Sequence, residues 1–306
     1  MQMSALLEKM AIFVALMVIG YVCGRTKYVS PSFAKDSSKL VINVFMFATI
    51  INSVISSDLS IAGDGFAMAI LVMSAAIVIN YVVAAVACRV IPMDDGQRPQ
   101  FELLIAVVNN MFIALPILAV LYGNLAVFYC ALANISYNII LYSYGIYRLQ
   151  STGGRARVRL RDMLSMPLIA TVIALFLFLL RPPIPGVVKQ LMSTMSGATM
   201  PLSMLVIGAS LGSVSLLDSF RNWRLYVMSA LRLAVCPLLV WLVLRLVTDD
   251  PVLLNTAVIV SASPSGIIVT ALSIQYGKDA VFTSEGILLG TVLSMLTIPA
   301  VAFLLG

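Results

Sequence analysis

Histidine is absent from this 306-residue sequence, and cysteine and charged residues are scarce. Without histidine, the chain lacks the commonest metal ligand and the side chain that usually carries protons near neutral pH. The four cysteines stand singly inside apolar runs, which is typical of packing residues rather than of disulfide partners or metal ligands. We therefore expect no metal site and no resident cofactor. These cysteines are Cys23, Cys88, Cys130 and Cys236.

The low charge content also excludes the soluble globular class. Charged residues make up 10% of the chain and hydrophobic residues 61%, with a mean hydropathy of +1.05. No soluble domain approaches these values, so the sequence predicts a polytopic membrane protein embedded in a lipid bilayer. In such a protein a net charge of +6 indicates basic cytoplasmic loops and not a nucleic-acid partner.

The sequence also lacks the motifs that are typical of enzymes, ATP-driven pumps and channels. A membrane-embedded enzyme needs a nucleophile beside a base, or metal ligands at fixed spacing, and the sequence has no such pattern. It has no phosphate-binding loop, so the chain does not drive transport by ATP on its own. A channel would show a continuous polar stripe, which the apolar runs do not contain. A secondary transporter is the remaining class, with a channel or an enzyme as less favoured alternatives.

The apolar runs predict an all-α fold of about ten transmembrane helices. The first run ends at Arg25 without a small-residue cleavage site, so we expect a retained helix and not a signal peptide. The runs cover residues 5–24, 40–56, 66–91, 101–122, 125–147, 163–180, 191–211, 225–247, 251–277 and 280–305.

The order of these runs predicts two halves. Residues 1–150 form the first five-helix repeat, residues 151–161 a basic cytoplasmic linker, and residues 162–306 a second repeat. Five spans in a half require the second half to be inverted relative to the first. Most of the 19 lysines and arginines lie in loops after odd-numbered spans. By the positive-inside rule both termini are then extracytoplasmic.

The run at 101–122 contains polar and helix-breaking residues in its middle. Pro116 removes a backbone donor, and Leu115 before it is expected to leave α-helical geometry. Asn109 and Asn110 can end a helix and hydrogen-bond the backbone that the break leaves free. In a bilayer such a break survives only where protein or a wet cavity surrounds it.

The run at 251–277 repeats this feature in the second half. Ser263 is expected to cap a new half-helix that begins at Pro264, with the N–H groups of Ser265, Gly266 and Ile267 converging near the midplane. Two interrupted spans in corresponding halves indicate a transporter site, and half-helix N-termini favour an anion. The candidate substrate-binding residues are Asn109, Asn110, Pro116, Ser263, Pro264, Ser265 and Gly266.

Two charged residues lie inside predicted spans, where an ionisable group is a functional-site hypothesis. Arg232 is expected to raise the positive potential around the bound anion, or else to pair with a backbone carbonyl in a structural role. Glu285 is the deepest carboxylate that the sequence suggests, with Glu102 at a span edge. Glu285 either couples protons, binds sodium or balances Arg232.

Three segments resemble the auxin efflux carrier family. Residues 109–116, Asn-Asn-Met-Phe-Ile-Ala-Leu-Pro, are similar to its fourth-span motif, in which an asparagine precedes a phenylalanine and a Leu-Pro or Ile-Pro pair. Residues 198–211 resemble its seventh span and residues 290–299 its last. The resemblance implies a crossover fold shared with bile acid:sodium symporters and secondary transport of small organic anions. These are auxin-like acids in plants and dicarboxylates such as malonate or malate among bacteria.

Two departures from the family pattern limit this expectation. Met111 and Ala114 stand where the family often has glycine, which leaves the substrate open. The short basic central loop favours a bacterial member of the inner membrane. A sodium-coupled organic anion symporter of the bile-acid type is the alternative. Small-residue steps at Gly20 with Gly24, Gly208 with Gly212 and Gly286 with Gly290 indicate close helix packing within one protomer or a homodimer seam.

Overall fold

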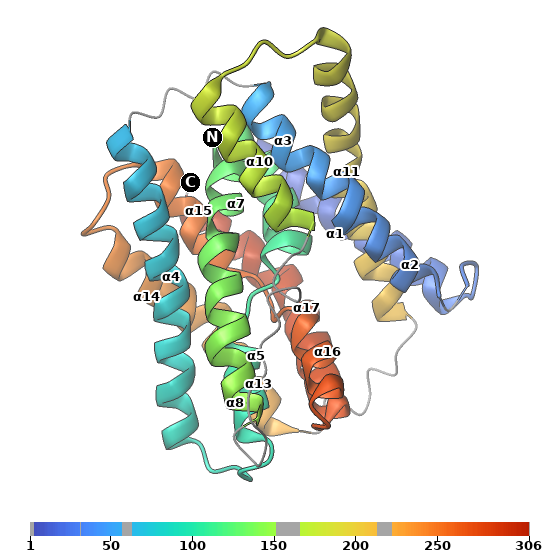
Figure 1. Ribbon diagram of the computed structural model, residues 1–306. Coiled ribbons are helices and arrows are strands. Elements are labelled where there is room, and N and C mark those ends of the chain that lie inside the picture. Colours follow the sequence, from blue (N-terminus) through green and yellow to red (C-terminus); the bar gives the residue numbers. More distant parts are fainter. Residues whose placement is uncertain (1–2, 31, 57–62, 151–165, 213–221, 306) are drawn as a thin grey trace.

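The computed structural model describes residues 3–30, 32–56, 63–150, 166–212 and 222–305 (Figure 1). Every regular element in these ranges is a helix, and the one β-type pairing is an isolated bridge between Val108 and Ser265. The expected all-α class is therefore confirmed. The linker predicted at 151–161 lies outside the described residues.

Described helices lie in each of the ten apolar runs. In the first half they are α1 (Met3–Arg25), α2 (Phe33–Leu40), η1 (Val41–Phe45), α3 (Met46–Ile55), α4 (Gly63–Val90), α5 (Arg98–Ala106), η2 (Asn110–Ala114), α6 (Leu115–Leu121), α7 (Gly123–Ile140), η3 (Leu141–Gly145) and α8 (Ile146–Gln150). In the second half they are α10 (Met166–Leu180), α11 (Gly186–Gly212), α13 (Trp223–Ala230), η4 (Leu231–Val235), α14 (Cys236–Leu244), α15 (Pro251–Ala262), α16 (Ile268–Gln275) and α17 (Ala280–Leu305). The η elements are single π-helical turns.

Six described helices are long and apolar enough to cross a bilayer, and four further apolar helices are shorter. The long ones are 36–55, 65–90, 123–150, 186–212, 223–244 and 280–305, and the shorter ones are 11–25, 110–121, 166–180 and 251–262. Two of the shorter helices, 110–121 and 251–262, belong to the interrupted runs. The structure therefore supports a multi-pass membrane protein, whereas ten crossings stay a prediction.

The helices pack in two groups. The first group joins α1, α2, α3, α10 and α11, and the second joins α4 to α8 with α13 to α17. In Figure 1, α2 and α11 lie on the right of the molecule and α4 and α14 on the left. The groups meet where α3 and α10 pack on α7 and where α1 and α11 approach α17 and α6. Each group therefore takes corresponding segments from both halves of the chain.

Glycines allow the backbones of α1 and α11 to lie in direct contact. A Cβ atom on Gly20 would lie 2.2 Å from the carbonyl oxygen of Leu205, and one on Gly208 would lie 2.0 Å from that of Met17. Neither distance leaves room for a side chain, so these small residues make a close contact between two helices of one protomer. A homodimer stays a prediction.

Candidate functional site

The first interrupted run breaks at residues 107–109, before the proline that was expected to break it. Helix α5 ends at Ala106, Val107 is extended with φ −90° and ψ 113°, and the chain is helical again from Asn110. Pro116 lies in the first turn of α6, inside the second half-helix. Leu115 keeps α-helical angles, φ −59° and ψ −47°, so the expected distortion before the proline is wrong.

A π-helical turn accounts for the tolerance of Pro116. In η2 the N–H of Leu115 donates to the carbonyl of Asn110, five residues back. The wider turn changes the hydrogen-bond register just before the ring that removes one donor. The same arrangement recurs in the second half, where η4 directly precedes Pro237 in the first turn of α14.

The second interrupted run breaks over residues 263–267. Helix α15 ends at Ala262, with Ser263 as an extended C-cap, and α16 begins at Ile268 with Ile267 as its N-cap. Ser263 and Pro264 therefore finish the first half-helix and do not begin the second, contrary to the sequence expectation. The Ser263 hydroxyl explains this, because it donates to the carbonyl of Ile259 one turn back and cannot cap a following helix.

The two breaks meet as a short antiparallel pair. Val108 lies opposite Ser265, the Asn109 N–H donates to the Pro264 carbonyl at 2.8 Å, and the Gly266 N–H donates to the Val107 carbonyl at 2.9 Å. Breaks from opposite halves of the chain thus satisfy each other's backbone, as buried polar groups require. The Gly266 N–H is consequently not available to a ligand, although it was expected to be.

Side chains reinforce the same contact. The Ser265 hydroxyl donates to the Leu104 carbonyl in the last turn of α5. A Cβ atom on Gly266 would lie 3.0 Å from the Val108 carbonyl oxygen and 3.3 Å from the Tyr137 hydroxyl. Ser265 and Gly266 therefore bring the two interrupted segments together, and the Ser265 hydroxyl is already engaged as a donor.

Arg232 completes the contact from η4. Its side chain is fully buried, and its Nε and Nη1 donate at 2.9 Å to the carbonyls of Ser263 and Ile105. These carbonyls belong to the C-terminal ends of α15 and α5, which carry partial negative charge. The pairing with carbonyls that the sequence offered as the structural alternative is thus what the structure contains.

The two N-terminal ends at the crossing are more accessible than the C-terminal ends. Ile267, which precedes α16, is 52% exposed, and Asn109, which precedes η2, is half-buried. The Asn109 side-chain oxygen accepts a hydrogen bond from the Phe112 N–H at 3.3 Å, so it caps the second half-helix. Asn110 behaves differently because it is buried and its amide donates to Asn134 on α7 at 3.0 Å.

The carboxylates are arranged differently from the expectation. Glu285 is partly exposed on α17, and the hydrogen bonds of Arg232 go to carbonyls and not to this residue. Glu102 on α5 is the more deeply buried carboxylate at 1% exposure. It accepts hydrogen bonds from the Tyr144 hydroxyl and from Arg148 Nε, both at 2.6 Å. The sequence reasoning missed this cluster because Glu102 lies near the start of its apolar run.

Asn134 and Asn138 on α7 are further polar residues close to the first break, and they are not among the candidate site residues from the sequence. Asn138 donates to the Asn134 carbonyl at 2.8 Å, and Asn134 supports Asn110. Their spacing of four residues places them on one face of α7. That spacing, inside the apolar run that follows the interrupted one, was the available signal.

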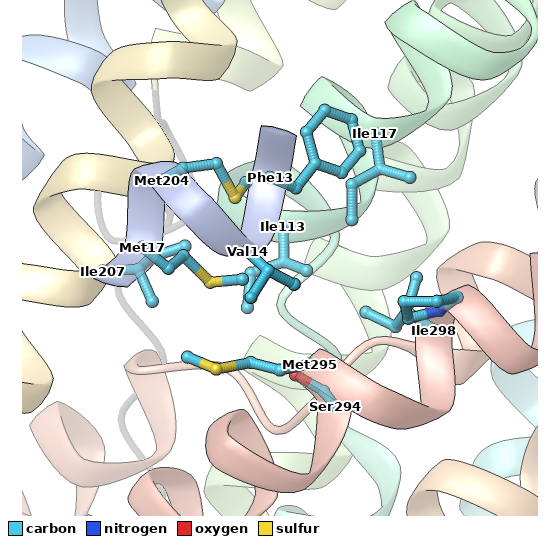
Figure 2. Close-up of a pocket in the computed structure, with 11 residues that line it drawn as sticks. Phe13, Val14, Met17, Ile113, Ile117, Met204, Ile207, Ser294, Met295 and Ile298 are labelled. Carbon is cyan, nitrogen blue, oxygen red and sulfur yellow. The ribbon is translucent and has the colours of Figure 1, made fainter. Parts of the chain in front are cut away.

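A narrow apolar cavity lies between the two helix groups (Figure 2). Phe13, Val14 and Met17 come from α1, and Met204 and Ile207 from α11; opposite them lie residues of η2, α6 and α17, namely Ile113, Ile117, Ser294, Met295, Ile298 and Pro299. The cavity measures about 20 Å³, room for a single water molecule. An organic anion does not fit there in this conformation.

Comparison with known proteins supports a transport role. A family model described as a membrane transport protein matches residues 5–159 and 155–302 of the chain. A protein of Methanothermobacter thermautotrophicus (strain Delta H), named an uncharacterized transporter, is 23% identical over 285 residues. The match covers 93% of each chain. The similarity therefore extends over both interrupted helices and the helices around them.

Proposed function

The chain belongs to the membrane transport protein family, and on this premise we propose that it is a secondary transporter of small organic anions. The resemblance to auxin efflux carriers suggests carboxylates as the substrate class, with dicarboxylates such as malonate or malate as the first compounds to test. The binding place that we propose is the crossing of the two interrupted helices.

The observation that carries this proposal is the unequal exposure of the four helix ends at the crossing. The C-terminal ends of α5 and α15 are buried, and the guanidinium of Arg232 donates to carbonyls of both. The N-terminal ends of η2 and α16 include the half-buried Asn109 and the exposed Ile267. Helix N-termini carry about half a positive charge each, which favours a carboxylate.

Asn109 is the side chain that we assign to direct contact with the substrate. It sits at the start of the 12-residue half-helix Asn110–Leu121 and is more accessible than Asn110. Its amide nitrogen supplies a donor suited to a carboxylate while its oxygen caps the helix. In this proposal Asn110, Ser263, Pro264, Ser265 and Gly266 shape the site, and Pro116 belongs to the half-helix behind it.

Movement between the two helix groups provides the access that a transporter needs. The cavity of Figure 2 lies at their interface, beside Ile113 and Ile117 of the second half-helix, and is closed to organic anions. We propose that sliding of α1 and α11 past α6 and α17 widens it alternately toward each side of the membrane. An apolar wall without charged residues suits a sliding interface because no ion pair has to break.

The membrane arrangement completes the proposal. The two helix groups take corresponding segments from both halves, which supports ten spans in an inverted five-plus-five repeat. Basic residues in the loops after odd-numbered spans support extracytoplasmic termini and a bacterial inner membrane. A cytoplasm-active reporter that works when fused after Leu305 would refute this orientation.

The decisive experiment is uptake of labelled carboxylates by liposomes that contain the purified protein. Mono- and dicarboxylates are compared with neutral amides of the same size, with and without sodium and proton gradients. We expect saturable uptake of a carboxylate that excess unlabelled substrate inhibits. Absence of uptake for the whole panel, by a protein that remains folded in the liposomes, would refute the proposed substrate class.

A further inference from the structure

Arg232 is a buried positive charge without a carboxylate partner among the described residues. It is 0% exposed, and among the described residues no carboxylate forms an ion pair with it. Its third nitrogen, Nη2, is buried and makes no hydrogen bond in the described part of the chain. A buried guanidinium without a counter-ion is costly, so the groups around it must stabilise the charge in another way.

The carbonyl groups of the two broken helices do this. The C-terminal end of α5 offers the Ile105 carbonyl and that of α15 offers the Ser263 carbonyl, each 2.9 Å from a guanidinium nitrogen. Two negative helix ends that point at one place repel each other, and a cation between them removes the repulsion. Half-helix C-termini and unwound carbonyls are the groups with which other broken-helix transporters hold mobile cations.

The local fold brings Arg232 to this place. It lies in the π-helical turn η4, and α17 packs closely on the neighbouring helix, since a Cβ on Gly286 would lie 3.2 Å from Met228. One turn further along α17, the Cβ position of Gly290 lies 3.9 Å from the hydroxyl oxygen of the buried Ser229. Helices α5, α15 and α17 also pack on η4, so the guanidinium is enclosed between them.

We propose that Arg232 is a positioning residue, a cation tethered to the chain that fastens the C-terminal ends of both broken helices. It takes the place that a mobile cation would otherwise occupy between them. It thereby leaves the N-terminal ends free for the anion, and in this respect the inference rests on the proposed function. Removal of the guanidinium leaves a carbonyl-lined space that a small planar cation can fill.

Chemical rescue tests the inference without substrate. The melting temperature of the purified, lipid-bound protein is measured for the wild type, Arg232→Ala and the control Arg245→Ala, an exposed arginine of the same predicted span. We expect Arg232→Ala to lower Tm by about 5–10 °C, and the control, whose exposed guanidinium stacks on Trp241, to lower it by much less. Millimolar methylguanidinium should restore Tm of Arg232→Ala saturably and leave the wild type unaffected.

Two additives separate charge and hydrogen bonding from general solvent effects. Urea has a similar planar shape but no charge, and tetramethylammonium has the charge but no N–H donor; neither should restore Tm. Equal restoration by urea, or none by methylguanidinium, overturns the proposal. If Arg232→Ala cannot be purified, Arg232→Lys is compared with Arg232→Met: higher stability of the lysine variant supports the tethered cation, and equal stability overturns it.

The outcome is independent of the transport assay. Stability rescue measures only the cation site, so it can succeed even if no carboxylate is transported. Conversely, transport of a carboxylate by the wild type together with failed rescue would keep the proposed function and remove the tethered cation. The two proposals therefore fail by different results.

Discussion

The backbone N–H of Asn109 donates to the carbonyl oxygen of Pro264 at 2.8 Å, and this bond joins the break in one half of the chain to the break in the other. Together with the bond from the Gly266 N–H to the Val107 carbonyl, it shows that each break supplies a backbone hydrogen-bond acceptor to the other. A substitution at one break is thus expected to act on both half-helix pairs.

Gly266 provides the first test of this contact. In Gly266→Ala the new Cβ would lie 3.0 Å from the Val108 carbonyl oxygen, so we expect a loss of about 1–3 kcal/mol in unfolding free energy. Gly197→Ala is the matched control, because Gly197 is an exposed helical glycine with no atom within 4 Å of its Cβ position. Thermal unfolding in detergent measures both, and equal stability of the two variants would contradict the close contact.

Asn109 and Asn110 should respond differently to alanine. Asn110→Ala leaves Asn134 without its donor inside the protein, so we expect a stability loss of about 1–3 kcal/mol. Asn109→Ala removes a more accessible amide and a helix cap, with an expected stability loss of about 1 kcal/mol. Because only Asn109 is assigned to the substrate, KM for uptake should rise several-fold in Asn109→Ala alone. An unchanged KM in that variant would exclude its contact with substrate.

Glu102 is predicted to be a structural carboxylate. Replacing Glu102 by glutamine removes the charge that Arg148 and Tyr144 stabilise, and we expect a loss of about 1.5–3 kcal/mol. Glu285→Gln is the control, since Glu285 is partly exposed, and its effect on stability should be small. Thermal unfolding ranks the two, and a larger loss in Glu285→Gln would reverse the assignment.

The same Glu285 variant addresses coupling. With Arg232 bound to carbonyls, Glu285 is not held as its counter-charge, and a coupling role stays a prediction. Uptake by Glu285→Gln is measured over a range of pH with an imposed proton gradient. If Glu285 couples protons, the gradient should no longer accelerate uptake, whereas exchange of substrate across the membrane continues. A pH profile identical to that of the wild type would remove Glu285 from the cycle.

Sodium dependence distinguishes the main alternative. A sodium-coupled symporter needs a free cage of oxygens, and Arg232 already occupies the Ile105 and Ser263 carbonyls. We therefore expect the initial rate of uptake to remain unchanged when choline replaces sodium on both sides of the membrane. A rate that falls more than about tenfold would place a sodium site elsewhere in the protein.

Composition and periodicity were sufficient to predict the helical class, because apolar runs of bilayer length have few other solutions, whereas the count of ten spans stays a prediction. Local geometry was harder. The sequence predicted a break at Pro116. The π-helical turn before Pro116 accommodates the missing backbone donor, and the helix is interrupted at residues 107–109 instead. Propensity rules describe regular helices and do not anticipate such a turn.

Partners across the chain were beyond sequence reasoning. Arg232 was found as a buried charge, but nothing in its neighbourhood along the chain points to Ile105 or Ser263. The sequence placed Glu102 at the edge of a span. Its hydrogen-bond partners, Arg148 and Tyr144, lie more than 40 positions away along the chain, so the sequence did not reveal that it is buried. Both cases rest on tertiary contacts that a linear pattern does not contain.

The glycine contact between α1 and α11 has a consequence for biosynthesis. Helix α1 leaves the ribosome well before α11, which begins at Gly186, beyond the middle of the chain. The glycine face of α1 therefore lacks its partner helix until α11 has been synthesised. During that time lipid or an insertion factor must cover it. A nascent chain that stops before Gly186 leaves that face uncovered, so the first half cannot mature as a finished unit.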